Sequence, residues 1–291
     1  MTAPSNTGHW LPVRCLAAAG VVVATLSSSS TASAQTPTRL LVTVMDEAGA
    51  PVAGLTRDEF TVRLDDVELD LAGVEPAPTT VQVVAIFEGL AVTQQQLTSA
   101  LSQFIESLDD ESIVDMQSVD GELGAAIIEA IDDLSARAAP RPVILMLGQA
   151  SEIAPSALQS SQVRGRRRAT DLDGDIDRLA ASLREHGILF YGVSTAQVPL
   201  TNFERLAAGA GGHFHTIAAP RDLSGTMDAI GRELSTQYVL SFSSSAPARI
   251  PGISVSRPGP TTIRAIPLPR ARYRRSSCQP PVSAERAPLG R

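Results

Sequence analysis

The sequence predicts an α/β fold: a Rossmann-like, mainly parallel sheet with helices on both faces, joined to a small antiparallel β module. Two observations predict it. Between residues 81 and 237, short apolar segments alternate with longer amphipathic segments, as expected for consecutive βαβ units. On both flanks of this region the apolar residues instead recur at every second position, which is typical of half-buried antiparallel strands. We therefore expect the two flanks to pair with each other.

The first flank, residues 39–75, is expected to form the N-terminal strands of the β module. Residues 39–45 alternate in polarity, and a turn containing Gly49 and Pro51 follows. A second alternating stretch, residues 60–71, is interrupted at Asp65 and Asp66, which predicts a hairpin turn. A linker is expected at residues 75–80.

The central region, residues 81–237, is expected to contain five strands and five helices. The strands are expected at 81–87, 113–119, 142–148, 188–194 and 211–217. The helices are expected at 93–108, 122–136, 171–185, 202–208 and 221–237. Three of the strands are almost wholly apolar, as in sheets that are covered on both faces. One face of the first helix is expected to point inward, with Leu97, Leu101, Phe104, Ile105 and Leu108.

The second flank, residues 238–273, returns to strand-like patterns separated by Pro and Gly, and is expected to complete the β module. Residues 274–291 are polar and Pro-rich, which predicts a disordered tail. The basic stretch Arg270 to Arg275 has two interpretations, a solvated tail or a contact with an anionic surface. Cys278 is expected to be an unpaired thiol, with an intermolecular disulfide as the alternative.

The N-terminus resembles an export signal. Arg14 precedes an apolar run from Cys15 to Leu26, and the small residues Ala32-Ser33-Ala34 follow. Residues 1–34 are therefore expected to be removed as a signal peptide, with cleavage after Ala34 and a secreted or periplasmic location. An uncleaved anchor is the competing interpretation. No later segment is long and apolar enough to predict a transmembrane helix.

Composition limits the possible functions. The chain has 291 residues, of which 43% are hydrophobic and 19% charged, as in globular proteins. Its formal net charge of -7 argues against a general nucleic-acid surface. All 24 basic residues are Arg, so neither a Schiff-base lysine nor a P-loop lysine is present.

Two phrases in the flanks resemble a known family. They are "VTVMDEAGAPVAGLTRDEFTVRLDD" at residues 42–66 and "LAAGAGGHFHTIAAPRDLSGTMDAIGRELSTQYVLSF" at residues 206–242. Together with the order of elements, they resemble the von Willebrand factor type A (VWFA) domain in a secreted bacterial subfamily. The resemblance covers residues 39–273 and implies a metal-ion-dependent adhesion site at the carboxyl ends of the parallel strands.

The ligand pattern of that metal site is not preserved. The resemblance places the family's Asp on Glu88, its two Ser on Leu90 and Val92, its Thr near Leu123 and its last Asp on Gly148. Mg²⁺ needs several oxygen ligands in octahedral geometry, and only one of these five positions supplies an oxygen-bearing side chain. We therefore expect a degenerate metal site and no bound cofactor.

The resemblance then predicts an exported, non-enzymatic protein of adhesion or assembly type that binds a protein partner in the cell envelope or outside the cell. Its contact surface is expected to be the rim that comprises Glu88, Gly89, Leu90, Val92, Leu123, Gly148 and Gln149. The alternative is a Ca²⁺- or Mg²⁺-dependent adhesion or assembly factor. Its ion would be held at the Asp171–Asp177 loop or at Glu88.

Two other patterns in the sequence are candidate metal sites. Asp171, Asp173 and Asp175 alternate around Gly174 like a calcium loop, but the closing Glu of that pattern is absent, and an acidic helix start is the favoured interpretation. His213 and His215 lie on one face of a predicted strand, where they would either bind a metal or pack at the sheet margin. No nucleophile motif and no phosphate-binding glycine loop is present, so no catalytic residue is predicted.

Overall fold

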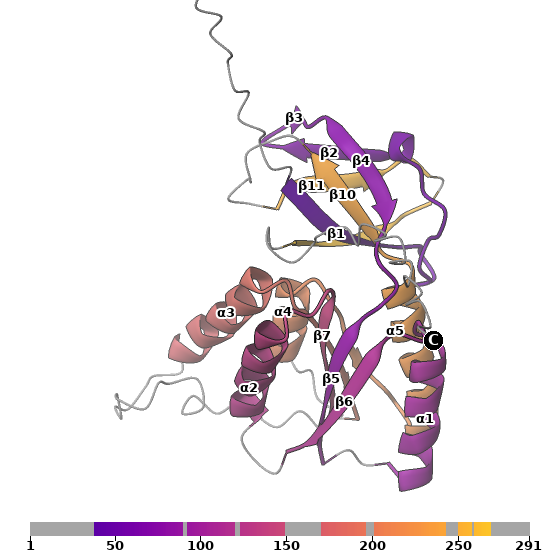
Figure 1. The fold of residues 1–291 in the computed structure, drawn as a ribbon, viewed down its shortest axis with the longest axis vertical. Coiled ribbons are helices and arrows are strands. Elements are labelled where there is room, and N and C mark those ends of the chain that lie inside the picture. Colours follow the sequence, from indigo (N-terminus) through magenta and orange to yellow (C-terminus); the bar gives the residue numbers. More distant parts are fainter. Residues whose placement is uncertain are drawn as a thin grey trace, which may run out of the picture. The chain divides into compact units, whose positions relative to one another are not determined.

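The computed structural model describes residues 38–89, 92–119, 123–148, 170–195, 201–242, 250–257 and 259–268. All of them belong to one compact unit, Gln35–Arg291. Within it the predicted fold class is confirmed, because a parallel sheet with helices is accompanied by antiparallel sheets built from both flanks of the chain (Figure 1).

The parallel sheet has five strands in the order β6-β5-β7-β8-β9. Their bounds are β5 Gln82–Glu88, β6 Ile113–Ser118, β7 Pro142–Gly148, β8 Leu189–Ser194 and β9 Phe214–Thr216. Every residue of β7 and β8 is buried, as their unbroken apolar sequences predict. β5 lies between β6 and β7, so its carboxyl end is near the middle of the sheet edge where ligands bind in open α/β folds.

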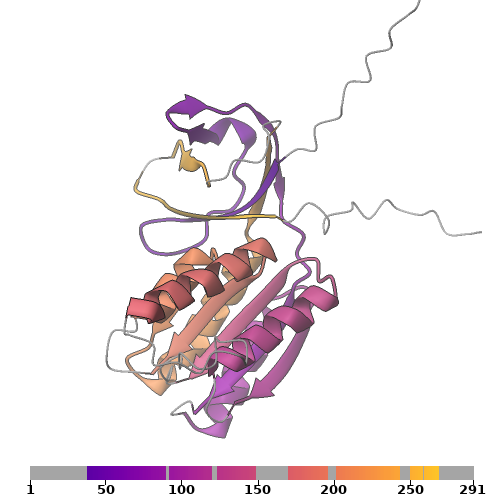
Figure 2. The same cartoon turned by 90° about the vertical axis from the view of Figure 1, so that its left-hand side faces the viewer.

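Five helices cover the two faces of this sheet. Their bounds are α1 Gln94–Glu106, α2 Leu123–Ala136, α3 Thr170–Glu185, α4 Thr201–Gly209 and α5 Leu223–Ser235. Helices α2, α3 and α4 pack with Val84 and Ile86 on one face, and Figure 2 shows α2 and α3 in front of the sheet. Helices α1 and α5 pack with Val83 and Ala85 on the other face. Alternate residues of β5 therefore enter two separate cores.

Local signals in the sequence explain several of these boundaries. Thr93 caps α1, because its hydroxyl oxygen accepts a hydrogen bond from the Gln96 N–H at 3.3 Å, and the Gln96 side chain accepts one from the Thr93 N–H at 3.0 Å. Gly187 follows α3 with φ of 61°, a left-handed conformation that ends the helix.

The β module consists of two antiparallel sheets, in the orders β12-β1-β10-β4 and β11-β2-β3. The strand bounds are β1 Thr38–Met45, β2 Phe60–Leu64, β3 Val67–Glu68, β4 Leu71–Pro76, β10 Tyr238–Phe242, β11 Gly252–Val255 and β12 Thr262–Pro267. The predicted hairpin between β2 and β3 is present. Asp65 and Asp66 have φ of 47° and 64°, as a two-residue type I′ turn requires.

A polar network joins the β module to the parallel sheet and its helices. Arg141 is 2% exposed and donates hydrogen bonds to the carbonyls of Pro78 and Leu234 and to the side chain of Gln237. Gln237 in turn donates to the Thr43 hydroxyl at 2.8 Å. The linker between β4 and β5 is thereby fixed to the end of α5.

Three details differ from the sequence-based expectations. β4 extends to Pro76, so the linker to β5 is shorter than predicted, because residues 71–76 pair with β10. Ile105 was assigned to the inward face of α1 but is 51% exposed, while Ala100 and Phe104 are fully buried. The last strand of the sheet, β9, has only three residues of the seven predicted.

Candidate interaction site at the carboxyl ends of the parallel strands

Two predicted rim residues, Glu88 and Gly148, form one row with Ser194 across the end of the sheet. Glu88 on β5 is in register with Gly148 on β7, and Gly148 is in register with Ser194 on β8. Glu88 follows Ile86 by two residues and Gly148 follows Met146 by two, so all three positions of the row face the core under α2, α3 and α4. The two oxygen-bearing side chains therefore lie on the same face, on either side of a glycine.

Both oxygen-bearing side chains of this row are buried. Glu88 is 7% exposed and Ser194 is 0% exposed. Burying an ionised carboxylate costs free energy, because it loses its hydration, unless neighbouring groups form hydrogen bonds or ion pairs with it. The row is thus the polar margin of a core and not an open, water-filled cleft.

Gly148 leaves no room for a side chain. A Cβ atom built at this position would lie 2.4 Å from the Glu88 carbonyl oxygen and 3.0 Å from the Glu88 Cβ. Real Cβ contacts are essentially never shorter than 3.0 Å, so β5 and β7 would have to move to admit any larger residue. The close approach of the two strands explains why glycine occupies this position.

The other residues of the predicted rim have different surroundings. Gly89 is exposed, with φ of 52°, and turns the chain after β5. Val92 is half-buried and packs against the core under α1 and α5. Leu123 is 1% exposed, so its side chain belongs to the core and offers no contact surface. Leu90 and Gln149 lie outside the described residues. The structure thus brings together Glu88, Gly89 and Gly148.

This row does not fit the magnesium ion that the family resemblance implies. Glu88 is the one carboxylate in it, Gly148 cannot be replaced by a ligand residue without moving a strand, and Val92 is packed on a core. Among the described residues there is no group of three or more His, Cys, Asp or Glu placed to hold a metal ion. Mg²⁺ retains its hydration shell unless several oxygen ligands replace it.

The acidic stretch at residues 171–177 has a helical backbone, because α3 begins at Thr170. Residues two apart in a helix do not face each other, whereas a calcium loop directs alternate residues toward one ion. The side chains of Asp171, Asp173 and Asp175 lie outside the described part of the structure. Asp177 is described, and it forms an ion pair with Arg205 at 2.9 Å.

His213 and His215 lie side by side as the alternation predicted, with ring centroids 4.4 Å apart. Burial, and then the neighbouring His213 and Arg264, together lower the pKa of His215 from 6.5 to about 4. Burial and then Arg264 also lower the pKa of His213. The positive charge of Arg264 beside the pair opposes the binding of a cation. Two imidazoles alone also supply too few ligands, since no group of three or more His, Cys, Asp or Glu is placed around an ion among the described residues.

Sequence reasoning missed a buried polar cluster that centres on Glu233 of α5. The Glu233 carboxylate accepts a hydrogen bond from the Tyr191 hydroxyl and pairs with Arg264 of β12 at 2.6 Å. Burial, and then the carboxylate, raise the pKa of Tyr191 well above its usual range. No motif signals this group, because its three residues come from three distant segments.

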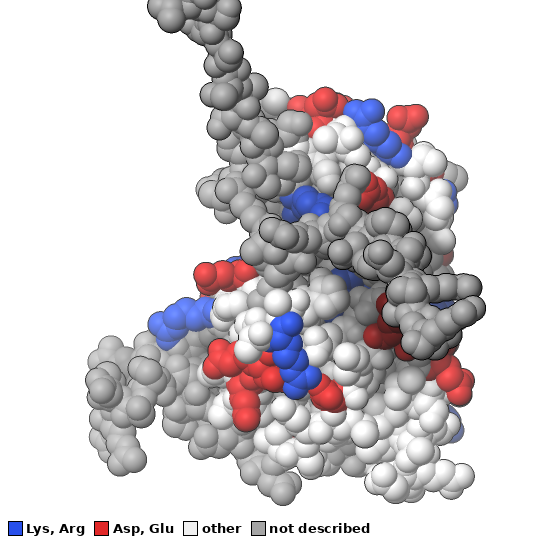
Figure 3. All heavy atoms as spheres, in the orientation of Figure 1, with Lys and Arg blue, Asp and Glu red and all other residues white. Residues whose placement is uncertain are grey.

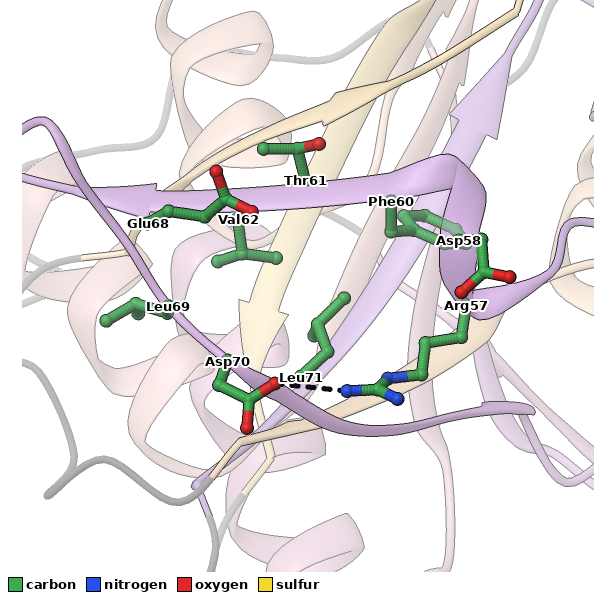
Figure 4. A pocket seen from close by; sticks show the side chains of 9 residues that line it. All are labelled: Arg57, Asp58, Phe60, Thr61, Val62, Glu68, Leu69, Asp70 and Leu71. Carbon is green, nitrogen blue, oxygen red and sulfur yellow. Dashed lines mark hydrogen bonds and ion pairs between the residues drawn. The ribbon is translucent and has the colours of Figure 1, made fainter.

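A separate pocket of about 510 Å³ lies in the β module, between β2 and the segment that leads into β4 (Figure 4). Phe60, Val62 and Leu71 supply apolar lining, and Arg57 pairs with Asp70 at 3.0 Å. Residues 57–71 alone line this pocket, so it shares no residue with the rim.

The sequence matches no protein-family model, and no curated protein matches it. The resemblance to the VWFA domain therefore stays a prediction that depends on residues 42–66, residues 206–242 and the order of elements. Among the residues that the structure describes, no helix has both the length and the apolar character needed to cross a lipid bilayer.

Proposed function

We propose that this chain is an exported, non-enzymatic interaction protein that resembles VWFA domains and has lost their metal site. It binds a protein partner through the rim beyond β5 and β7, without a divalent cation. The observation that carries this proposal is the row Glu88, Gly148 and Ser194, which contains one carboxylate, and that carboxylate is buried beside a glycine that admits no side chain.

Two features of the row support contact without an ion. A metal-dependent adhesion site needs ligand side chains that an incoming carboxylate completes, and this row supplies too few of them. Gly89 is exposed at the carboxyl end of β5, in the place where open α/β sheets bind their ligands. Contact there would depend on shape and apolar surface, which are the usual determinants at the centre of protein interfaces.

The experiment is a pull-down from envelope extract with the wild-type chain, with Leu90→Asp and with Val67→Asp. Val67 is 65% exposed on β3, so its variant controls for an added charge at an exposed apolar position away from the rim. We expect Leu90→Asp to lose partners that wild type and Val67→Asp both retain, in buffer that contains EDTA. An unchanged partner set in Leu90→Asp would contradict the rim.

Titration calorimetry with Mg²⁺ and Ca²⁺ separates this proposal from a metal-dependent adhesion or assembly factor. We expect no saturable binding of either ion at micromolar concentration. Strong binding that Asp173→Ala weakens would place an ion at residues 171–177. Strong binding that Glu88→Gln weakens would place it at the row, and either result would replace the proposed function.

A further inference from the structure

An open strand edge lies at one side of the parallel sheet, along β6. Among the described residues β6 pairs with β5 alone, so it is one of the two edge strands of the sheet, at the opposite end from β9 (Figure 1). The Ile113 N–H donates to the Val81 carbonyl at 3.0 Å, and the Val119 N–H donates to the Phe87 carbonyl at 2.8 Å. The odd-numbered residues of β6 therefore face β5.

The remaining backbone groups of β6 point away from the sheet. In a parallel pair, alternate residues direct both N–H and C=O toward the same neighbour. Val114, Met116 and Ser118 accordingly direct their N–H and C=O groups to the open side. A row of outward backbone groups of this kind is a template for an added strand.

Exposed apolar side chains flank this edge on both faces. Five large hydrophobic residues are exposed in the described part of the chain, and three of them are here: Ile105 at 51%, Ile113 at 53% and Met116 at 66%. Val114 packs against the core under α1 and α5, so Met116, two residues later, lies on the same face as Ile105 of α1. Ile113 lies on the opposite face, with α2.

The surroundings of the edge are strongly acidic. The described residues from 92 to 137 carry eight carboxylates, which are Glu106, Asp109, Asp110, Glu111, Asp115, Glu129, Asp132 and Asp133, and one basic side chain, Arg137. Arg137 is already paired with Asp115 and Asp133. Figure 3 shows red atoms gathered over α2.

We propose that β6 is a docking edge that accepts an extended, basic segment of a protein partner as an additional strand. Backbone hydrogen bonds to Val114, Met116 and Ser118 supply the affinity, and charge supplies the selectivity. A second copy of this chain is disfavoured as the occupant, because it would bring two acidic edges together and their like charges repel. The site is separate from the rim, so this inference goes beyond the proposed function.

The two faces of the edge also define the pattern of the partner strand. Side chains of an added strand alternate between the faces. On the α1 side they meet Met116 and Ile105. On the α2 side they meet Ile113 at the start of β6 and then Asp115 and the acidic residues of α2. We therefore expect a partner segment in which apolar residues alternate with arginine or lysine.

The experiment measures binding of fluorescein-labelled hexapeptides to the full chain by fluorescence anisotropy. The probe is Arg-Val-Arg-Val-Arg-Val, compared with Glu-Val-Glu-Val-Glu-Val and with the block peptide Arg-Arg-Arg-Val-Val-Val. We expect the alternating basic peptide to bind most tightly, the block peptide at least about tenfold more weakly, and the acidic peptide not at all. Equal binding of the two basic peptides would show attraction by charge alone and would overturn the added strand.

Substitutions at Met116 separate the backbone from the side chain. Met116→Pro removes an N–H that points away from β5, so the hydrogen bonds between β5 and β6 remain. Met116→Ala keeps that N–H and removes only the side chain. We expect Met116→Pro to weaken the peptide by at least about tenfold more than Met116→Ala does. Circular dichroism checks that both variants fold.

If Met116→Pro does not fold, the double variant Glu129→Gln with Asp132→Asn decides, because both positions are exposed on α2. We expect it to lose several-fold in affinity for the basic peptide. Unchanged affinity would overturn the proposal.

Sedimentation that shows dimers abolished by Met116→Arg would identify a second copy as the occupant. Tighter peptide binding after removal of residues 269–291 would identify the chain's own Arg270–Arg275. Either outcome would also overturn it.

Discussion

Gly148 determines what the row at the end of the sheet can hold. Its missing side chain allows β5 and β7 to approach closely at Glu88, and the same closeness removes a ligand position from any ion site. Gly148→Asp introduces the residue that the VWFA pattern would place here, and it should therefore destabilise the fold without creating a magnesium site. We expect a loss of about 1–3 kcal/mol in the free energy of unfolding for Gly148→Ala, measured by urea denaturation, because a larger residue must displace a strand.

Gly225 provides the matched control, since a Cβ added there meets no atom within 4 Å and the position lies on the exposed side of α5. Gly225→Ala should stabilise the protein by about 0.5–1 kcal/mol through helix propensity. Calorimetric binding of Mg²⁺ by Gly148→Asp, with unchanged stability, would show that the strands move apart easily and that their close approach does not prevent an ion site.

The Arg264–Glu233 pair is the least exposed ion pair among those of the described residues. Glu233 is 2% exposed, and Arg264 has no other carboxylate bonded to it among the described residues. Glu233→Gln should cost about 3–5 kcal/mol of unfolding free energy, because it leaves the largely buried Arg264 side chain, which is 15% exposed, without a counter-charge. Chemical denaturation followed by circular dichroism measures this loss.

Two comparisons make that prediction specific. Asp228→Asn breaks an exposed pair with Arg232 on the same helix and should change stability by less than about 0.5 kcal/mol. The double variant Glu233→Leu with Arg264→Met should recover most of the loss, since neither charge then remains buried. A loss in Glu233→Gln no larger than that of Asp228→Asn would contradict the assignment of Glu233 as a buried counter-ion.

At the level of elements, β9 and β12 make the junction sensitive to acid. His213 and His215 flank Phe214 of β9, and Arg264 of β12 lies close enough to lower the pKa of both imidazoles. The pKa of His215 falls from 6.5 to about 4 on folding, so the unfolded chain binds the extra proton between these two pH values. The contribution of neutral His215 to the free energy of unfolding is therefore complete above pH 6.5 and decreases as the pH falls toward 4.

The measurement is the free energy of unfolding at intervals from pH 7 to pH 4, for wild type and for His215→Gln. The wild type should lose at most about 3 kcal/mol more than the variant over this range, which is the limit set by the pKa change. Carboxylates that titrate in the same range affect both proteins equally and cancel in the difference. Parallel curves would mean that His215 is as easily protonated in the folded protein as in the unfolded chain.

The elements themselves were largely predictable from local signals. The apolar runs of β5, β7 and β8, the Thr93 cap and the Asp65-Asp66 turn each have a physical cause that acts within a few residues. Ile105 was misplaced because helical periodicity cannot show how far a neighbouring element covers a face. At the edge of the sheet, β6 leaves one side of α1 uncovered.

The candidate site was predictable only in part, because strand register is non-local. The sequence suggested Glu88 and Gly148, but it could not show that Ser194 completes their row, since β8 joins it through pairing with β7. The burial of Leu123 depends on how α2 packs. The outward backbone of β6 depends on hydrogen bonds to β5, and no residue pattern encodes which side remains open.

At the scale of the whole molecule, the β module and the parallel sheet share one apolar core. Leu41 of β1 and Ile266 of β12 belong to the cluster that contains Leu189, Tyr191 and Leu234. A Cβ placed on Gly211, just before β9, would lie 3.0 Å from the Cβ of Ile266, so the two parts pack at contact distance. A shared core couples their unfolding.

This coupling predicts a single unfolding transition for both parts. All five α-helices belong to the parallel-sheet part, so ellipticity at 222 nm reports mainly on it, whereas Ile266 lies in the β module. Ile266→Ala should remove about 2–4 kcal/mol of unfolding free energy and should lower the midpoint of the helical signal. Hydrogen exchange of β1 and β10 amides should give the same loss.

Ile253→Ala is the control within the β module, because Ile253 packs only against the module's own core. If the two parts unfold together, this variant must also shift the helical midpoint, although the substituted residue touches no helix of the α/β part. Two separate transitions, with the helical signal unmoved in either variant, would show that the β module melts independently. The buried contacts of Arg264 and Arg141 would then be insufficient to transmit its loss.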